Sequence, residues 1–243
     1  MAKVHMVLQG KGGVGKSMIA ATLAQYINAR APSESALCID TDPVNATFAG
    51  YETFKVHRLE IMEEMEISSR KFDELVTLIS EAKGDVVIDN GASTFVPLSH
   101  YLISNDVPNL LLEMGHELII HTVITGGQSL LDTLNGFSQL ASQFPAEAKF
   151  VVWLNPFLGE VAHEGKPFDS MKAYQQNKER VSAIIRIPTL KQETHGRDFS
   201  DMLKRRHTLD HAISDTTLGI MPRQRLKLVK AQLFDQLNAA AVI

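Results

Sequence analysis

Residues 3–17 read KVHMVLQGKGGVGKS, and the second half of this stretch, residues 10–17, matches the pattern G-x-x-x-x-G-K-[ST] in full. The apolar run before the glycines predicts a buried strand, and residues 17–31 repeat apolar side chains at helical spacing. A glycine-rich loop between a strand and a helix can turn its N–H groups inward, where the helix adds the positive end of its dipole. The stretch therefore predicts a phosphate-binding loop.

Each residue type in this loop has a chemical role toward a nucleoside triphosphate. Lys16 places a point charge at the β- and γ-phosphates, and the Ser17 hydroxyl can coordinate Mg²⁺. We therefore expect the chain to bind ATP together with Mg²⁺. The residues expected to contact the nucleotide in this segment are Gly10, Lys11, Gly12, Gly13, Val14, Gly15, Lys16, Ser17 and Met18.

Two further apolar runs, residues 36–40 (ALCID) and 85–89 (DVVID), end in aspartate. A buried parallel strand has this form when it delivers a carboxylate at its carboxyl end. We expect Asp89 to hold Mg²⁺, and Asp40 and Asp42 to lie near the γ-phosphate, one supporting the metal and the other orienting the attacking water. The alternative for Asp40 and Asp42 is a helix cap or an Asx-turn before Pro43.

Strand and helix patterns alternate along the rest of the chain, which predicts parallel strands joined by helical crossovers. The expected fold is a doubly wound, mostly parallel α/β sheet covered by helices on both faces, a three-layer sandwich with its ligand outside the strand carboxyl ends. No linker or repeat divides the chain, so we expect one domain over residues 1–243. The expected strands include residues 118–125, 150–154 and 183–187, and the expected helices 68–82, 107–114, 128–144, 168–178 and 224–241.

Composition narrows the class of protein. The chain has 243 residues, 44% of them hydrophobic, but no apolar run near the roughly 20 residues that a membrane span needs. Its first residues do not resemble a signal peptide. The single cysteine, Cys38, excludes a disulfide and an iron–sulfur cluster of the kind that needs two thiolates per chain. These features predict a reducing, cytoplasmic setting.

The charge is unevenly distributed. Residues 178–230 hold 12 Lys and Arg against 6 Asp and Glu, although the whole chain has a net charge of −4. This basic C-terminal quarter could contact nucleic acid, acidic lipid or an acidic protein, or could simply be solvated helix surface.

The loop resembles the deviant phosphate loop of the ParA/MinD family of P-loop ATPases, because it carries an additional lysine, Lys11. The Asp40-x-Asp42-Pro43 element and the run into Asp89 resemble the next two motifs of that family. The resemblance implies that Lys11 reaches across an ATP-bound homodimer to the partner's phosphates, that Asp42 assists the hydrolytic water, and that Asp40 and Asp89 serve Mg²⁺. It also implies that Asn155 reads the adenine edge, for which the alternative is a turn before Pro156.

Two stretches depart from the family pattern. Val44 follows Pro43 where the family usually has glutamine, and residues 89–93 read DNGAS where it has small residues and prolines. These departures bear on the rate of hydrolysis rather than on nucleotide binding.

Within the family, the chain most resembles plasmid conjugal-transfer members, at residues 5–10, 89–93, 97–104 and 197–203, which implies a role in DNA transfer between bacteria.

Three functions follow as hypotheses. The first is a slow, partner-stimulated ATPase that dimerises on ATP and positions or regulates a component of the transfer apparatus. The second is a plasmid partition ATPase that binds DNA nonspecifically through the basic quarter, and the third is a metabolic ATP-dependent ligase of the same fold.

Membrane contact is not expected, because the apolar stripe of the expected C-terminal helix, residues 224–241, is better explained by packing on the sheet. That stripe comprises Leu226, Val229, Leu233 and Leu237.

Overall fold

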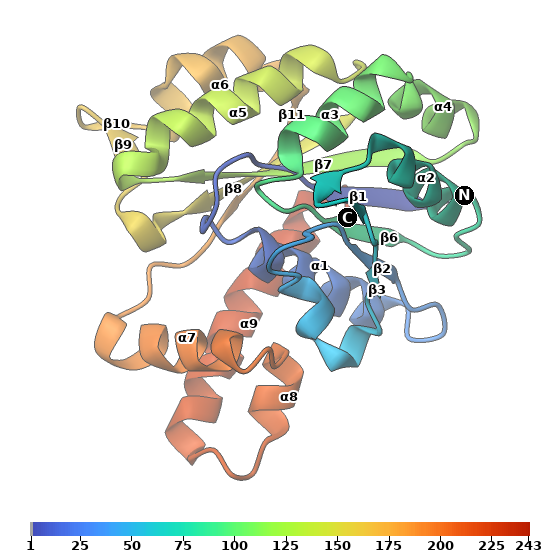
Figure 1. The fold of residues 1–243 in the computed structure, drawn as a ribbon. Coiled ribbons are helices and arrows are strands. Elements are labelled where there is room, and N and C mark those ends of the chain that lie inside the picture. Colours follow the sequence, from blue (N-terminus) through green and yellow to red (C-terminus); the bar gives the residue numbers. More distant parts are fainter. Residues whose placement is uncertain (1) are drawn as a thin grey trace.

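Seven strands form the central sheet of the computed structural model, which describes residues 2–243 (Figure 1). Every neighbouring pair of these strands is parallel. The chain begins in the middle of the sheet and builds outward in both directions, which confirms the doubly wound α/β fold. Across the sheet the order is β11 (Val181–Arg186), β8 (Lys149–Asn155), β7 (Glu117–Thr125), β1 (Lys3–Val7), β6 (Val86–Asp89), β2 (Leu37–Asp40) and β3 (His57–Arg58).

Helices cover both faces of the sheet, as the alternating pattern predicts. One face is covered by α2 (Phe72–Ser80), α3 (Phe95–Ser104), α4 (Val107–Glu113), α5 (Leu130–Gln143) and α6 (Lys172–Asn177). The other is covered by α1 (Lys16–Arg30), α7 (Arg197–Lys204), α8 (Leu209–Ser214) and α9 (Ile220–Ala240). The sheet therefore separates two hydrophobic cores.

Side chains of strand β1 alternate between the two faces of the sheet and so pack into both cores. Val4 and Met6 pack into the core beneath α2 to α6, whereas Val7 packs into the core beneath α1. His5 is fully buried, and its Nδ1 lies 3.0 Å from His121 Nε2. Its Nε2 has no partner among the described residues.

The C-terminal helix α9 packs against the sheet. All four residues of its predicted apolar stripe are buried in the core that α1 shares. The stripe is therefore explained by the fold, as expected. Within residues 2–243, no helix is both long enough and apolar enough to cross a bilayer.

Several elements depart from the sequence-based expectation. Helix α9 begins four residues before the predicted start, and the start predicted for α6 is instead a 3₁₀ turn. Helices α3, α7 and α8 were not predicted; in α3, Pro97 in the first turn interrupts the apolar pattern while fitting a helix start. Short helical turns occur at η1 (Phe48–Gly50), η2 (Glu52–Phe54), η3 (Ser69–Lys71), η4 (Gly127–Ser129), η5 (Pro156–Leu158), η6 (Phe168–Ser170), η7 (Lys178–Arg180) and the π-type η8 (Gln192–Gly196).

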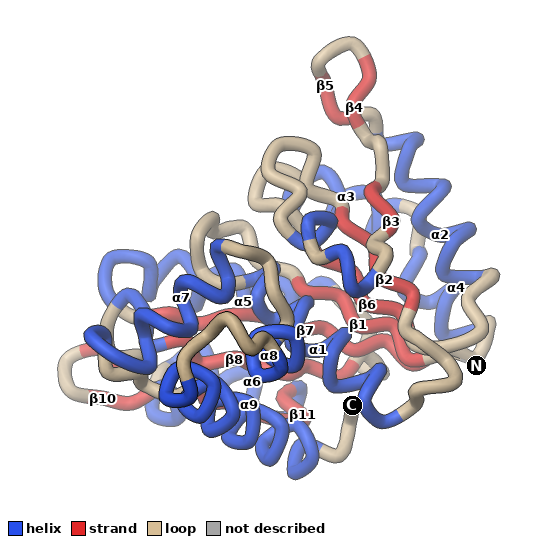
Figure 2. Tube along the Cα trace, turned by 90° about the horizontal axis from the view of Figure 1, so that it is seen from below, coloured by secondary structure: helices blue, strands red, loops and turns tan. Residues whose placement is uncertain are grey.

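Two small hairpins extend from this framework. The first pairs β4 (Met62–Glu63) with β5 (Glu66–Ile67), and Figure 2 shows it standing away from the body of the molecule. The second pairs β9 (Ala162–His163) with β10 (Lys166–Pro167). Neither hairpin belongs to the central sheet.

Candidate nucleotide site

The glycine-rich loop connects the end of β1 to the start of α1, at the carboxyl edge of the sheet. Gly13 and Gly15 have φ values of +73° and +102°, in the left-handed region that other residues rarely adopt. Gly15 also precedes the first helical residue, Lys16. The loop thus has the backbone shape that lets consecutive N–H groups face an anion at a helix N-terminus.

The side chain of Lys16 is largely buried within this loop. Its Nζ donates a hydrogen bond of 2.9 Å to the carbonyl oxygen of Lys11 and so spans the loop from inside. Burial lowers the pKa of Lys16, and the nearby charges of Asp89 and Asp42 oppose that shift. These two carboxylates favour the ammonium form, which is the form that attracts phosphate.

Asp89 ends β6 next to β1 and is 2% exposed. Burial raises the pKa of Asp89 to about 7, and a hydrogen bond with Ser17 opposes the increase. Its Oδ1 has no hydrogen-bond partner in the described chain. Ser17 and Asp89 therefore place a hydroxyl and a carboxylate oxygen side by side, and oxygen donors of this kind fit Mg²⁺.

Asp40 and Asp42 differ in their availability. Both carboxylate oxygens of Asp40 accept backbone hydrogen bonds, from Asp42 N at 2.9 Å and from Ala49 N at 2.8 Å, and the residue is fully buried. Asp42 is half-buried, and its Oδ1 accepts from the backbone N–H groups of Val44 and Asn45. Both aspartates thus also make the turn contacts expected as the alternative, but Asp42 additionally lines the cavity at the loop.

Two adjoining cavities lie at this edge of the sheet. A polar one of about 580 Å³ is lined by Lys16, Ser17 and Asp42, and an apolar one of about 250 Å³ by residues of the 187–203 segment. They share Gly13, Gly15, Met18 and Leu203. A nucleotide could place its phosphates in the first and its base in the second.

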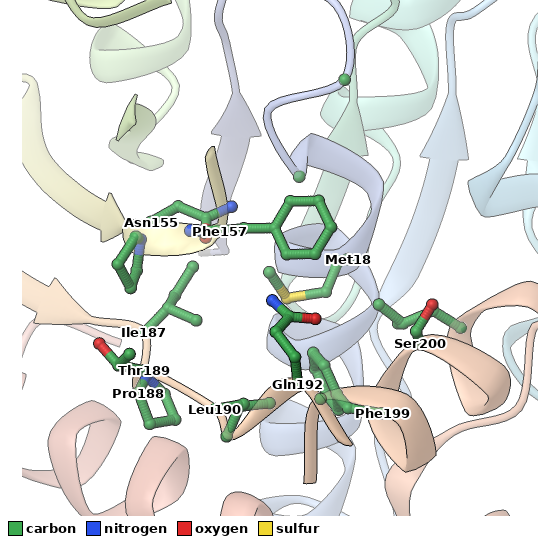
Figure 3. Close-up of a pocket in the computed structure, with 15 residues that line it drawn as sticks. Met18, Asn155, Phe157, Ile187, Pro188, Thr189, Leu190, Gln192, Phe199 and Ser200 are labelled. Atoms are coloured by element: carbon green, nitrogen blue, oxygen red, sulfur yellow. Dashed lines mark hydrogen bonds between the residues drawn. The ribbon is translucent and has the colours of Figure 1, made fainter. Parts of the chain in front are cut away.

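The lining of the apolar cavity suits a neutral group rather than a charged one. Figure 3 shows Met18, Phe157 and Gln192 directed toward it from three separate segments. No charged side chain lines it among the described residues. Gln192 was not predicted from sequence, because it lies in the irregular turn η8, far from any recognisable motif.

Asn155 ends β8 and lines the apolar cavity. Its Nδ2 donates to the carbonyl of Val14 at 2.9 Å, and its Oδ1 accepts from Phe157 N at 3.1 Å. A residue that contacts adenine must line the cavity that holds the base, and Asn155 does line the apolar cavity. However, the nitrogen and the oxygen of its side-chain amide are both already hydrogen-bonded to backbone groups. The predicted reading of the adenine edge stays a prediction. The chain turns after Asn155 rather than before Pro156, in the 3₁₀ turn η5 (Pro156–Leu158), which the Asn155 side chain caps.

Lys11 lies on the outer side of the loop. Its Nζ is 2.8 Å from Asp132 Oδ2, in an ion pair whose side chains are 41% and 57% exposed. An exposed pair of this kind contributes about 0–1 kcal/mol. Lys11 is therefore held loosely and can be released to contact another molecule.

The basic C-terminal quarter is partly neutralised within the fold. Arg225 pairs with Asp198 at 2.5 Å, Lys230 pairs with Asp210, and Asp201 lies between two basic side chains of α7. Pairing leaves the net positive charge of residues 178–230 unchanged, but it reduces the number of basic side chains there that are free of an acidic partner.

A family model described as the CobQ/CobB/MinD/ParA nucleotide binding domain matches residues 5–225. The chain belongs to this family. The match includes the loop, the aspartates at the ends of β2 and β6, and Asn155. It confirms the ParA/MinD resemblance, and its span contains the residues that line the two cavities described above.

Curated relatives extend the match over the whole chain. Two proteins of Escherichia coli, each named Protein TraL, are 68% and 66% identical over 243 residues, which is 100% of this chain and of each relative. This result confirms the likeness to TraL-type members of the family.

Solved structures share the fold at low identity. The MinC:MinD cell division protein complex of Aquifex aeolicus matches with a TM-score of 0.50 and 13% identity, covering 96% of both chains. A putative plasmid partition protein of Borrelia burgdorferi, bound to AMPPNP, matches with a TM-score of 0.50 and 13% identity over 98% of this chain and 99% of that one. At this identity the likeness concerns the fold alone.

Proposed function

We propose that the chain is a molecular switch that binds and slowly hydrolyses Mg²⁺–ATP, dimerises when ATP is bound, and positions or regulates a component of plasmid conjugal DNA transfer. The observation that carries the proposal is the polar cavity, which is lined by glycines of the loop, Lys16 and Ser17, with the buried Asp89 beside Ser17. The transfer role rests on the likeness to Protein TraL.

The chain's own groups have distinct tasks in this proposal. The loop N–H groups and Lys16 bind the phosphates, and Ser17 with Asp89 would hold Mg²⁺, which withdraws charge from the phosphate oxygens when bound. Asp42, on the cavity wall, would orient the attacking water. Asp40 keeps the segment after β2 in place through its two backbone hydrogen bonds.

The face around the cavities supports self-association. Among the exposed apolar side chains, Val44 (73% exposed) lines the polar cavity and Phe157 (66%) lines the apolar one, and Leu131 (58%) is next to Asp132. Lys11, loosely paired with Asp132 next to Leu131, belongs to the same face. Closing two copies across it would cover this apolar surface and bring each Lys11 toward the partner.

Titration of the purified chain with fluorescent ATP tests the core of the proposal. Saturable binding that needs Mg²⁺ is expected, and Lys16→Ala should weaken it at least tenfold, since a charged hydrogen bond to phosphate contributes about 1.5–3 kcal/mol. Lys227→Ala, on the exposed side of α9, is the matched control that also removes one lysine. Equal affinities of the parent and Lys16→Ala would refute the proposal.

A further inference from the structure

Asn90 is the residue that follows Asp89 at the end of β6, and its burial is unusual. It is 1% exposed, yet neither the oxygen nor the nitrogen of its side-chain amide has a hydrogen-bond partner among the described residues. A primary amide offers two donor hydrogens and an acceptor oxygen. Leaving such a group buried without partners is unfavourable, so its retention calls for a physical reason.

The surroundings of Asn90 point to a ligand. The residue lines the polar cavity together with Lys16 and Ser17, and its neighbour Asp89 also has an unpartnered oxygen. Other buried polar side chains at this edge of the sheet are hydrogen-bonded: Thr94 bonds to two carbonyl groups, and Asn155 bonds to the loop. At this edge of the sheet, the unpartnered atoms thus belong to Asp89 and Asn90, at the end of β6.

The position within the cavity indicates which part of a nucleotide Asn90 would meet. The apolar cavity and the polar one join at Gly13, Gly15, Met18 and Leu203, and Asn90 lines the polar cavity only. Asp42, Ala92 and Ser93 share this property. A nucleotide with its base in the apolar cavity would therefore bring its outermost phosphate toward Asn90.

We propose that Asn90 binds the terminal phosphate of the triphosphate and thereby distinguishes ATP from ADP. Its NH₂ group donates to a γ-phosphate oxygen, and its oxygen accepts from a water molecule beside that phosphate. The proposal rests on the proposed function, because it requires that the loop bind a nucleotide. Asn90 departs from the family pattern, and in this role it adds a second γ-phosphate contact to the one expected of Lys16.

The test compares binding of Mg²⁺–AMPPNP and Mg²⁺–ADP to the parent chain and to Asn90→Ala. The variant should lose about tenfold or more in affinity for AMPPNP, since one hydrogen bond to a charged group is removed, and about twofold or less for ADP. Asn90→Asp keeps the shape but places a negative charge beside phosphate, so it should lose still more affinity for AMPPNP. Ser99→Ala is the matched control, because the Ser99 hydroxyl is also buried without a partner but does not line the cavity.

Thermal unfolding of the nucleotide-free proteins separates binding from folding. Removing an unsatisfied amide should leave the melting temperature of Asn90→Ala unchanged or higher. A lower melting temperature together with an unchanged AMPPNP-to-ADP affinity ratio would show a structural role and overturn the proposal. If the parent binds both nucleotides through Lys16 but the AMPPNP-to-ADP affinity ratio is the same in Asn90→Ala, only the role of Asn90 is refuted. If the parent shows no Lys16-dependent binding, both the role of Asn90 and the proposed function are refuted.

Discussion

The Nδ1 atom of His5 lies 3.0 Å from the Nε2 atom of His121, between two buried strands of the sheet. The indole N–H of Trp153 donates to Nδ1 of His121, also at 3.0 Å. Because an indole N–H can only donate, His121 must carry its proton on Nε2 and donate it to His5. A single chain of hydrogen bonds, Trp153 to His121 to His5, therefore fixes both imidazoles in their neutral form.

This chain predicts a loss of stability in mild acid. Burial, with a smaller contribution from Lys3, lowers the pKa of His5 to about 3, and burial lowers the pKa of His121 well below its ordinary value. Since the folded-state values lie below the unfolded value of about 6.5, the stability is fully present above that pH and is lost as pH falls toward the folded values. Between pH 6.5 and pH 5, the two histidines together should lower the free energy of unfolding by about 3 kcal/mol.

Urea denaturation at several pH values measures this loss. The double variant His5→Leu/His121→Leu removes both titrating groups and should remove this loss, whatever its absolute stability. The raised pKa of Asp89 acts in the opposite direction but is common to both proteins, so the difference between their pH profiles isolates the histidines. A variant that keeps the full slope between pH 6.5 and pH 5 would contradict the assignment to these histidines.

The phosphate loop and the main βα units could be predicted because each depends on a local pattern. The strands ending at Asp40 and Asp89 are continuous apolar runs, and they do pair side by side. Hydrogen bonds between distant parts of the chain leave no such pattern. The Trp153–His121 bond and the loop contact of Asn155 join positions 32 and 141 residues apart.

The unpredicted part of the site has a similar explanation. Asn90 is recognisable in sequence only as a departure from the family, whereas its burial without partners depends on packing around β6. Helices α7 and α8 have only eight and six residues, too few turns for a clear periodic pattern, and both pack against α9.

Lys11→Ala should separate nucleotide binding from dimerisation. The exposed ion pair with Asp132 contributes little, so the free energy of unfolding should change by less than about 0.5 kcal/mol. Monomer binding of ATP should persist, because Lys16 spans the loop independently of the Lys11 side chain. ATP-dependent dimers, measured by analytical ultracentrifugation, should disappear.

Asp132→Ala is the control for that experiment. It breaks the same ion pair but keeps the lysine free to reach a second copy, so ATP-dependent dimers should persist. Dimers that survive in Lys11→Ala, or are lost equally in both variants, would count against a role for Lys11 across the interface.

Asn155→Ala should loosen the phosphate loop. The substitution removes the bond to Val14 and the one to Phe157 N, and the loss of two hydrogen bonds at a buried site should cost about 1–3 kcal/mol of stability. If Asn155 only positions the loop, affinities for ATP and GTP should fall by the same factor. If it reads the adenine edge, ATP should lose more, and isothermal titration with both nucleotides distinguishes the two roles.

Gly91→Ala should disturb hydrolysis while sparing the loop. A Cβ atom at Gly91 would lie 2.6 Å from Asp42 Cγ and 2.8 Å from Thr94 Oγ1, and Thr94 is fixed by its own hydrogen bonds. Asp42 must therefore move, at a cost of about 1–3 kcal/mol for overpacking. ADP release under saturating Mg²⁺–ATP should fall about tenfold or more if Asp42 orients the water, since small misplacements of a catalytic group have large effects.

Gly84→Ala is the matched control, because its added Cβ meets nothing closer than 3.6 Å. Undiminished turnover in Gly91→Ala, with the altered position of Asp42 confirmed crystallographically, would remove Asp42 from the proposed mechanism.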